Sequence, residues 1–157
     1  MKVDDPWSAG DDMRLDQVLD SKGSEVATIS PQDTVAELVQ RLAELRIGAL
    51  VVSSDGETVT GIASERDVVR HLAQDGPDIM SGPVSSIMST TVTCSPIEAS
   101  TSDLMELMTN SRVRHVPVID GEESLIGIVS IGDVVKSRLG ELQDERDALI
   151  QYVTVGG

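Results

Sequence analysis

The sequence repeats itself at a fixed interval of 66 residues, and this repeat limits the possible folds more than any other feature. Residues 61–69 read GIASERDVV and residues 127–135 read GIVSIGDVV. The same interval relates Arg46 to Arg112 and Leu38 to Leu104. A constant interval across several expected helices and strands indicates internal duplication. Because a unit of about 60 residues buries too little surface to be stable alone, the two units are expected to share a core.

Hydrophobic patterning predicts the same order of elements in both units: strand, helix, strand, strand, helix. In the first unit we expect strands at 26–29, 49–52 and 59–63, and helices at 35–45 and 64–74. In the second unit we expect strands at 91–94, 116–119 and 125–129. One helix is expected to begin at 100, and a second helix is expected to run from 130 to about 152. Short helical segments at 14–20 and 84–88 precede the two units. The expected fold class is α+β, with tandem β-α-β-β-α repeats packed sheet to sheet about a pseudo-two-fold axis.

These elements divide the chain into four parts. Residues 1–12 contain four aspartates, a proline and a glycine, and are expected to form a flexible acidic arm. Residues 13–76 and 77–140 form the two repeats, with a linker rich in glycine and proline at their boundary. Residues 141–157 extend the last helix and end in a tail. Such a long acidic helix is expected to pack on a partner subunit, which predicts a homodimer.

Charge and composition exclude several classes of function. The net charge of −15 repels phosphodiester backbones and anionic membranes, so neither nucleic acid nor a membrane is an expected partner. The chain has one Trp, one Tyr and no Phe, too few aromatics for a base-stacking surface. It has no run of eighteen apolar residues and no hydrophobic signal sequence. With Cys94 as the single cysteine, these features favour a cytoplasmic location.

The repeated motif places a serine before each second helix and an aspartate three residues later. Ser64 and Asp67 form one pair, and Ser130 and Asp133 form the other. One interpretation is structural, because a serine and an acid at this spacing make a capping box. The other is functional, because the amides at a helix N-terminus, next to polar side chains, form a site for an anionic ligand. The sequence motif alone is compatible with both interpretations.

The motif Gly-Ile-Val-Ser-x-x-Asp, preceded by Arg-x-x-His-Val-Pro-Val and by a helix after Ser-Pro, resembles the CBS domain. Two copies in register resemble a CBS pair, or Bateman module, over about residues 13–140. The resemblance to small stand-alone bacterial CBS proteins implies a regulatory module with clefts for AMP, ADP, ATP, NAD(H) or an S-adenosyl compound. It implies that Asp67 and Asp133 bind ribose hydroxyls and that Ser64 and Ser130 lie near phosphate. The adenine slots then correspond to Ile47, Gly48 and Ala49 in the first unit and to Val113, Arg114 and His115 in the second.

The two expected clefts differ in charge. Arg114 and His115 are expected to meet phosphate near Asp133, and Arg66 is expected to do so near Asp67, while Ile131 follows the serine of the second motif. We expect the Asp133 cleft to be the tighter site. The expected function is that of an adenine-nucleotide sensor that is not an enzyme. Two histidines, one cysteine and no Gly-x-x-x-x-Gly-Lys loop leave little basis for catalysis. The alternative is a ligand-free interaction module that binds an unidentified protein through its dimer surface or its acidic C-terminal helix.

Overall fold

The computed structural model describes residues 13–23 and 25–156, so the expected acidic arm at 1–12 lies outside the described residues. The first half contains α1 (Leu15–Lys22), β1 (Thr28–Ile29), α2 (Val35–Leu45), β2 (Ala49–Val52), β3 (Gly61–Ser64) and α3 (Glu65–Asp75). Two 3₁₀ turns, η1 (Pro77–Ser81) and η2 (Val84–Ser86), follow. The second half contains β4 (Ser95–Pro96), α4 (Thr101–Ser111), β5 (His115–Ile119), β6 (Leu125–Ser130) and α5 (Ile131–Val155).

The four main helices of the two units begin with the same N-terminal capping arrangement. Thr34, Ser64, Ser100 and Ser130 are N-caps, and each side-chain oxygen accepts a hydrogen bond from the backbone N–H three residues later. The acidic side chain at that third position in turn accepts from the N-cap backbone N–H, which completes a capping box. The capping interpretation of the motif is therefore correct at both Ser64 and Ser130, and the structure adds further contacts described below.

Each unit forms a three-stranded sheet with one parallel and one antiparallel pair. In the first sheet β2 lies between β1 and β3, and in the second β5 lies between β4 and β6. The expected strand at 91–94 is wrong, because β4 is only Ser95–Pro96, in register with Val118 and Ile119. The preceding segment pairs with the other unit instead: Ser89 and Ile62 exchange two backbone hydrogen bonds of 2.9 and 3.0 Å.

Each hydrophobic core contains the short helical segment that precedes the other unit in the sequence. Leu15 and Leu19 of α1 are buried in the core of the second unit, with Leu104 and Val116. Val84 and Ile87, which precede the second unit in sequence, are instead buried in the core of the first. The repeats at 13–76 and 77–140 therefore describe how the sequence is duplicated, whereas each core is built from both halves of the chain.

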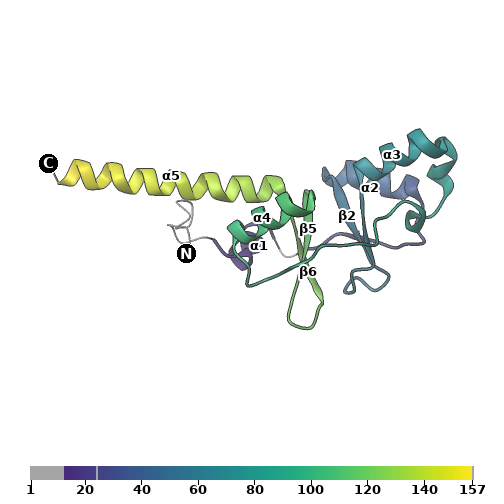
Figure 1. Ribbon diagram of the computed structural model, residues 1–157, viewed down its shortest axis with the longest axis horizontal. Helices are drawn as coiled ribbons and strands as arrows, with labels where there is room; N and C mark the ends of the chain where they lie inside the picture. Colours follow the sequence, from purple (N-terminus) through teal and green to yellow (C-terminus); the bar gives the residue numbers. More distant parts are fainter. Residues whose placement is uncertain (1–12, 24, 157) are drawn as a thin grey trace.

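The sheets of the two units lie between two layers of helices. Figure 1 shows α2 and α3 on one side, α1 and α4 on the opposite side, and β2, β5 and β6 between them. Leu50 and Val52 belong to the core of the first unit, so Val51, which is also fully buried, points toward the opposite face of its sheet. The backbone N–H of Leu125 donates to the carbonyl of Glu57 across the two units at 2.8 Å. This arrangement confirms the expected α+β fold class.

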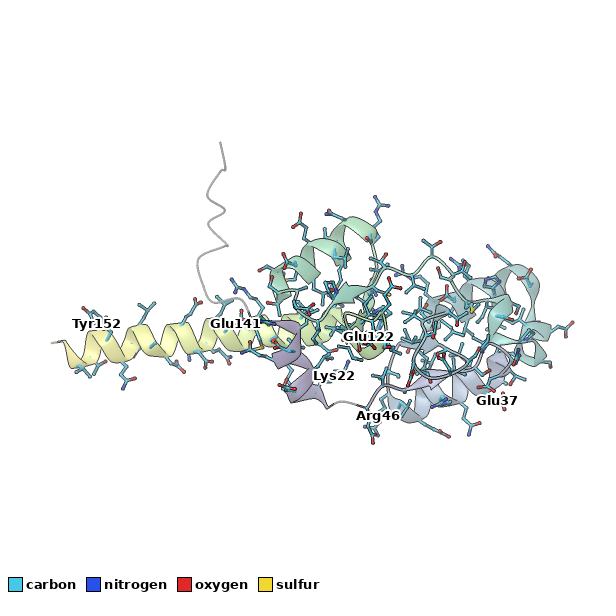
Figure 2. The ribbon with its side chains drawn as sticks, turned by 90° about the horizontal axis from the view of Figure 1, so that it is seen from below. Lys22, Glu37, Arg46, Glu122, Glu141 and Tyr152 are labelled. Carbon is cyan, nitrogen blue, oxygen red and sulfur yellow. The ribbon has the colours of Figure 1, made fainter. Side chains whose placement is uncertain are left out.

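Helix α5 extends far beyond this body. Glu141 lies where the helix leaves the body, and its Oε1 accepts a hydrogen bond from the backbone N–H of Met13 at 2.8 Å. Tyr152 lies on the projecting part, which in Figures 1 and 2 has no other element beside it. The helix ends at Val155, three residues beyond the expected end. No helix in the described part of the chain is both long enough and apolar enough to cross a membrane.

Candidate functional site between the two units

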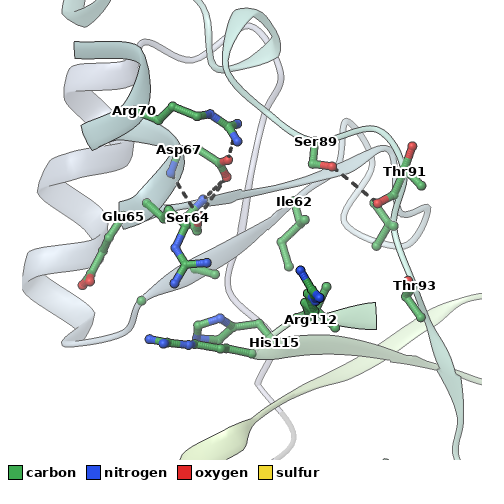
Figure 3. A pocket seen from close by; sticks show the side chains of 16 residues that line it. Ile62, Ser64, Glu65, Asp67, Arg70, Ser89, Thr91, Thr93, Arg112 and His115 are labelled. Carbon is green, nitrogen blue, oxygen red and sulfur yellow. Dashed lines mark hydrogen bonds and ion pairs between the residues drawn. The ribbon is translucent and has the colours of Figure 1, made fainter. Parts of the chain in front are cut away.

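A cavity of about 350 Å³ lies at the N-terminus of α3, and both units line it (Figure 3). The first unit contributes residues from the start of β2, from β3 and from the first turns of α3. The second contributes the segment between α4 and β5, and the linker between the units closes another side. The lining residues are Gly48, Ala49, Ile62, Ser64, Glu65, Arg66, Asp67, Arg70, Ser89, Thr91, Val92, Thr93, Arg112, Val113, Arg114 and His115.

Hydrogen bonds fix the side chains of Ser64 and Asp67 at the N-terminus of α3. Asp67 Oδ2 accepts from both the backbone N–H and the hydroxyl of Ser64, each at 2.9 Å. Asp67 Oδ1 accepts from the guanidinium of Arg70, one turn later, at 2.9 Å. The Asp67 residue is only 8% exposed, yet its carboxylate borders the cavity. Because a carboxylate oxygen has two lone pairs, Oδ1 can accept a further hydrogen bond from a ligand.

The cavity is locally basic in a strongly acidic protein. Four of the twelve basic residues of the chain line it: Arg66, Arg70, Arg112 and Arg114. Glu65 and Asp67 are the acidic lining residues. The N-terminus of α3 adds the positive end of its dipole and amide donors. An anion with hydroxyl groups is therefore the type of ligand that this combination of arginines, amides and one rigid carboxylate suits best.

His115 lies at the junction of the two units. A Cβ atom at Gly48 would lie 3.2 Å from Cε1 of His115, so the imidazole packs directly against that glycine. Burial lowers the pKa of His115, the positive charges of Lys22 and Arg114 lower it further, and Glu65 and Asp133 partly offset this effect. The ring is therefore neutral at pH 7, and one of its nitrogens can accept a hydrogen bond.

Asp133, the repeat equivalent of Asp67, has a different environment. Its Oδ2 accepts a hydrogen bond of 2.6 Å from Nζ of Lys22, which also donates to the carbonyl of Ile128 at 2.8 Å. Burial by itself raises the pKa of Asp133, but the hydrogen bonds from Lys22 and Ser130 and the charge of Lys22 outweigh this effect and lower it. The lysine therefore holds one oxygen of the carboxylate that the resemblance assigns to a ribose.

The structure gathers most, but not all, of the expected site residues around one cavity. Gly48, Ala49, Ser64, Arg66, Asp67, Val113, Arg114 and His115 all line it. Arg114 and His115 thus line the Asp67 cavity, although the sequence analysis assigned their charges to the cleft at Asp133. Ile47 packs against the core of the first unit. Ser130, Ile131 and Asp133 are not among the lining residues, and Ile131 is 48% exposed on α5.

Several lining residues were missed by sequence reasoning. Arg70 follows Asp67 by one helical turn, a spacing that could have identified it. Arg112 was named only as the repeat equivalent of Arg46; it ends α4 in a left-handed conformation with φ of 53°, and it also lines the cavity. Thr91 and Thr93 were placed in a strand of the second unit. Nothing in the local sequence indicates that they line this cavity, in a linker that pairs with β3 at Ser89.

The described residues offer little that would support covalent or metal chemistry. Within residues 13–23 and 25–156, no three His, Cys, Asp or Glu side chains form a group that could hold a metal ion. Cys94 is half-buried, and burial raises the pKa of its thiol, which disfavours the reactive thiolate.

Comparison with known proteins places this geometry in a family. The CBS domain model matches the chain twice, over residues 10–74 and 84–140. The crystal structure of the CBS-domain protein ATU1752 from Agrobacterium tumefaciens is 41% identical, with a TM-score of 0.76 over 80% of this chain and 99% of that one. The CBS domain protein PAE2072 from Pyrobaculum aerophilum, solved in complex with AMP, is 28% identical, with a TM-score of 0.68 over 77% of this chain and 89% of that one.

A curated plant relative shows the same similarity over a longer stretch. The CBS domain-containing protein CBSX3, mitochondrial, of Arabidopsis thaliana is 35% identical over 151 residues, which are 90% of this chain and 72% of that protein. The two family matches together cover most of the sequence, and each coincides with one copy of the 66-residue repeat. The chain therefore belongs to the CBS domain family, and its two units form a CBS domain pair.

Proposed function

We propose that this CBS pair is a regulatory module that binds an adenine nucleotide in the cavity at Asp67. The observation that carries the proposal is the position of the Ser64–Asp67 pair: it faces arginines of the other unit across one cavity. The similarity to PAE2072, solved with AMP, supports the choice of ligand class.

Each part of a nucleotide has a chemical counterpart in the cavity. The free lone pair on Asp67 Oδ1 accepts from a ribose hydroxyl, and charge-assisted bonds of this kind are short and strong. Arg66, Arg112 and Arg114 and the amides of α3 offset the charge of a phosphate. Ala49, Ile62, Val92 and Val113 form the apolar walls for adenine. At about 350 Å³ the cavity lies near the lower end of ligand pockets, roughly 300–1,000 Å³, and this favours a mononucleotide over NAD(H).

Binding regulates by holding the two units together. Gly48, Ser64 and Asp67 come from the first unit, and Arg112, Arg114 and His115 come from the second. A ligand that contacts both sets favours the arrangement in which they face one another, and so shifts the population of unit arrangements. The surface offered to a protein partner then changes with nucleotide concentration.

Calorimetry and thermal unfolding test the proposal with AMP, ADP, ATP, NADH and S-adenosylmethionine. A ligand at about 100 times its dissociation constant adds roughly 2.7 kcal/mol to the free energy of unfolding, which raises the melting temperature. We expect AMP or another adenine mononucleotide to give this shift and Asp67→Ala to abolish it. Asp103→Ala is the matched control, because Asp103 completes the capping box of α4 and does not line the cavity.

The two variants separate the functional role of Asp67 from its capping role. Loss of either cap costs about 1 kcal/mol of stability, so both variants should melt slightly earlier. Only Asp67→Ala should lose affinity. If both variants bind as the wild type does, Asp67 is a cap and the proposed site is wrong. If none of the five compounds shifts the melting temperature at millimolar concentration, the proposed ligand class is wrong. Incubation with ATP and a product assay tests the accompanying proposal that the protein is not an enzyme.

The alternative function, a protein-interaction module, is favoured by a separate observation. Helix α5 projects from the body and exposes large apolar side chains along its length, among them Leu149 and Val153. Truncation after Gln143 removes the projecting part and keeps the bond between Met13 and Glu141. If the truncated protein binds nucleotide normally but no longer assembles, α5 is an assembly surface and the cavity is the ligand site.

A further inference from the structure

Helix α5 carries a regular apolar stripe that the rest of the chain leaves uncovered. Val135, Leu139, Leu142, Leu149 and Val153 make up this apolar stripe, and their spacings of four, three, seven and four residues follow the a and d positions of a heptad repeat. Arg146 occupies the position between Leu142 and Leu149. Leu139, Leu149 and Val153 are 55%, 67% and 73% exposed, although such side chains are normally buried. A heptad stripe of this kind matches the seam of a two-helix coiled coil.

The charges beside the stripe select the direction of the partner helix. Residues 134–140 contain two basic residues, Lys136 and Arg138, and no acidic one. Residues 141–147 contain four acidic residues and one arginine. A parallel pair of α5 helices would place Arg146 against its own copy within the seam, which is repulsive, and would give Arg138 and Glu145, which flank the stripe at g positions, no partner of opposite charge. An antiparallel pair places Glu145 of one helix beside Arg138 of the other, because g positions face each other in that arrangement.

We infer that a second copy of this chain covers the apolar stripe from Val135 to Leu149, with its α5 antiparallel to the first. In an antiparallel coiled coil an a position faces a d position, so Leu139 faces Leu142 of the second copy. The same register places Val135 opposite Arg146, and Gly132 opposite Leu149, of the second copy. Residues 134–140 of one helix then lie along residues 141–147 of the other, which is the pairing that the charges favour. The contact is isologous, so each layer occurs twice about a two-fold axis.

The surface of α5 has a hollow where this register places a leucine. Gly132, Val135, Leu139 and Gly140 line an open hollow on the solvent side of the helix, where the two glycines leave space. Leu149 of the second copy lies at the level of Gly132 and fills this hollow. Val134 of α5 is buried with Leu15 of α1 and Leu104 of α4, whereas the neighbouring Val135 of the stripe is exposed, so α1 and α4 do not obstruct the approach. About 20 residues of each helix overlap, a length of roughly 30 Å.

Sedimentation equilibrium of Leu149→Lys and Gln151→Lys tests the pairing. Both positions are exposed on the same turns of α5, but Leu149 belongs to the apolar stripe and Gln151 does not. We expect the wild type and Gln151→Lys to be dimers and Leu149→Lys to be a monomer, with dimer dissociation constants that differ by at least 100-fold. Circular dichroism checks that both variants keep their helix content. A monomeric wild type at 100 µM, or a Leu149→Lys variant that stays dimeric, overturns the inference.

Disulfide trapping tests the direction of the helices. In a Cys94→Ser background, Val135→Cys is mixed with Arg146→Cys under mild oxidation. The antiparallel register predicts a cross-linked heterodimer of the two variants, because these positions face one another. It predicts no cross-linked dimer of Val135→Cys alone, because the two copies of residue 135 are then roughly 16 Å apart along the axis. A disulfide in Val135→Cys alone would indicate a parallel pair and would contradict the inference, whether or not the protein binds nucleotide.

Discussion

Nζ of Lys22 lies 2.6 Å from Oδ2 of Asp133, and this contact makes the two halves of a duplicated protein unequal. In the sequence repeat, Lys22 corresponds to Met88 and Asp133 corresponds to Asp67. Asp67 pairs with Arg70 of its own helix and borders a cavity, whereas Asp133 is held by a lysine from α1. Both carboxylates are therefore paired with a cation of the same chain, but only Asp67 borders the cavity, and only Asp133 is held by a cation from another helix.

Replacing Lys22 with methionine should free the second carboxylate. Lys22→Met restores the residue type found at the equivalent position 88 of the other unit. We expect the number of nucleotides bound per chain to rise from one to two, measured by isothermal titration calorimetry. The free energy of unfolding should fall by no more than about 1 kcal/mol, because the pair is partly exposed to solvent.

Arg14→Met is the control for this experiment, since it removes one positive charge near α1 and leaves Asp133 paired. It should keep a stoichiometry of one. If the wild type binds one nucleotide and Lys22→Met also binds one, Lys22 does not block a site. If the wild type binds none, the proposed function itself fails.

The stability contributed by Asp133 should depend on pH in the acid range. The pKa of Asp133 is lower in the folded protein than its usual value of about 3.9, so folding favours the charged form. Its contribution is then fully present above about pH 4 and is lost as pH falls through the folded-state pKa. Urea unfolding should show wild type more stable than Asp133→Asn by about 1 kcal/mol at pH 6, and the difference should shrink toward pH 2. A difference that stays constant over this range would contradict the role of the Lys22 pair.

The pKa of His115 should lie below its usual value of about 6.5. Burial and two nearby cations favour the neutral ring in the folded state, so its contribution to stability is present above pH 6.5 and is lost as pH falls below it. NMR titration of the imidazole Hε1 signal, assigned with His115→Gln, measures the value directly. Stability of the wild type relative to His115→Gln should also fall between pH 7.5 and 5.5. A titration midpoint above 6.5 would show that Glu65 and Asp133 outweigh burial.

Gly61 is required for the close contact between β3 and the linker. A Cβ atom there would lie 2.8 Å from both Sδ of Met88 and the carbonyl oxygen of Ser89, and the second is backbone that cannot move easily. Gly61→Ala should therefore lower the free energy of unfolding by about 1–3 kcal/mol, measured by denaturant titration. Gly121→Ala is the matched control, with no neighbour within 4 Å, and it should change stability by less than about 0.5 kcal/mol. Equal effects of the two substitutions would show that the linker shifts to relieve the contact.

Local sequence signals predicted most of the framework. The capping pairs at Ser64 and Ser130 gave helix starts that the structure confirms, because a capping box involves residues only three positions apart. The constant 66-residue interval then predicted that both units share one architecture. The expected strand at 91–94 failed because the chain just before it pairs with the other unit, Ser89 with Ile62, and local strand propensity does not include such a tertiary contact.

The site was predicted less completely than the fold. Ser64 and Asp67 were found because their motif is repeated, and Arg114 because it differs from its equivalent, Gly48. The cleft that Arg114 faces could not be deduced, because it depends on how the two units dock. The pairing of Lys22 with Asp133 joins residues 111 positions apart, and no periodicity connects them.

Because each core contains a short helical segment from the other half of the chain, the two halves must fold together. Leu15 and Leu19, near the start of the chain, reach their burial sites only after residues 104 to 134 exist. The first unit likewise remains incomplete until Val84 and Ile87 have left the ribosome. Neither half can therefore finish its interior during synthesis without the other, and the pair should unfold in a single cooperative transition. A fragment ending at residue 76 should behave as a loosely collapsed chain, although it carries a whole copy of the sequence repeat.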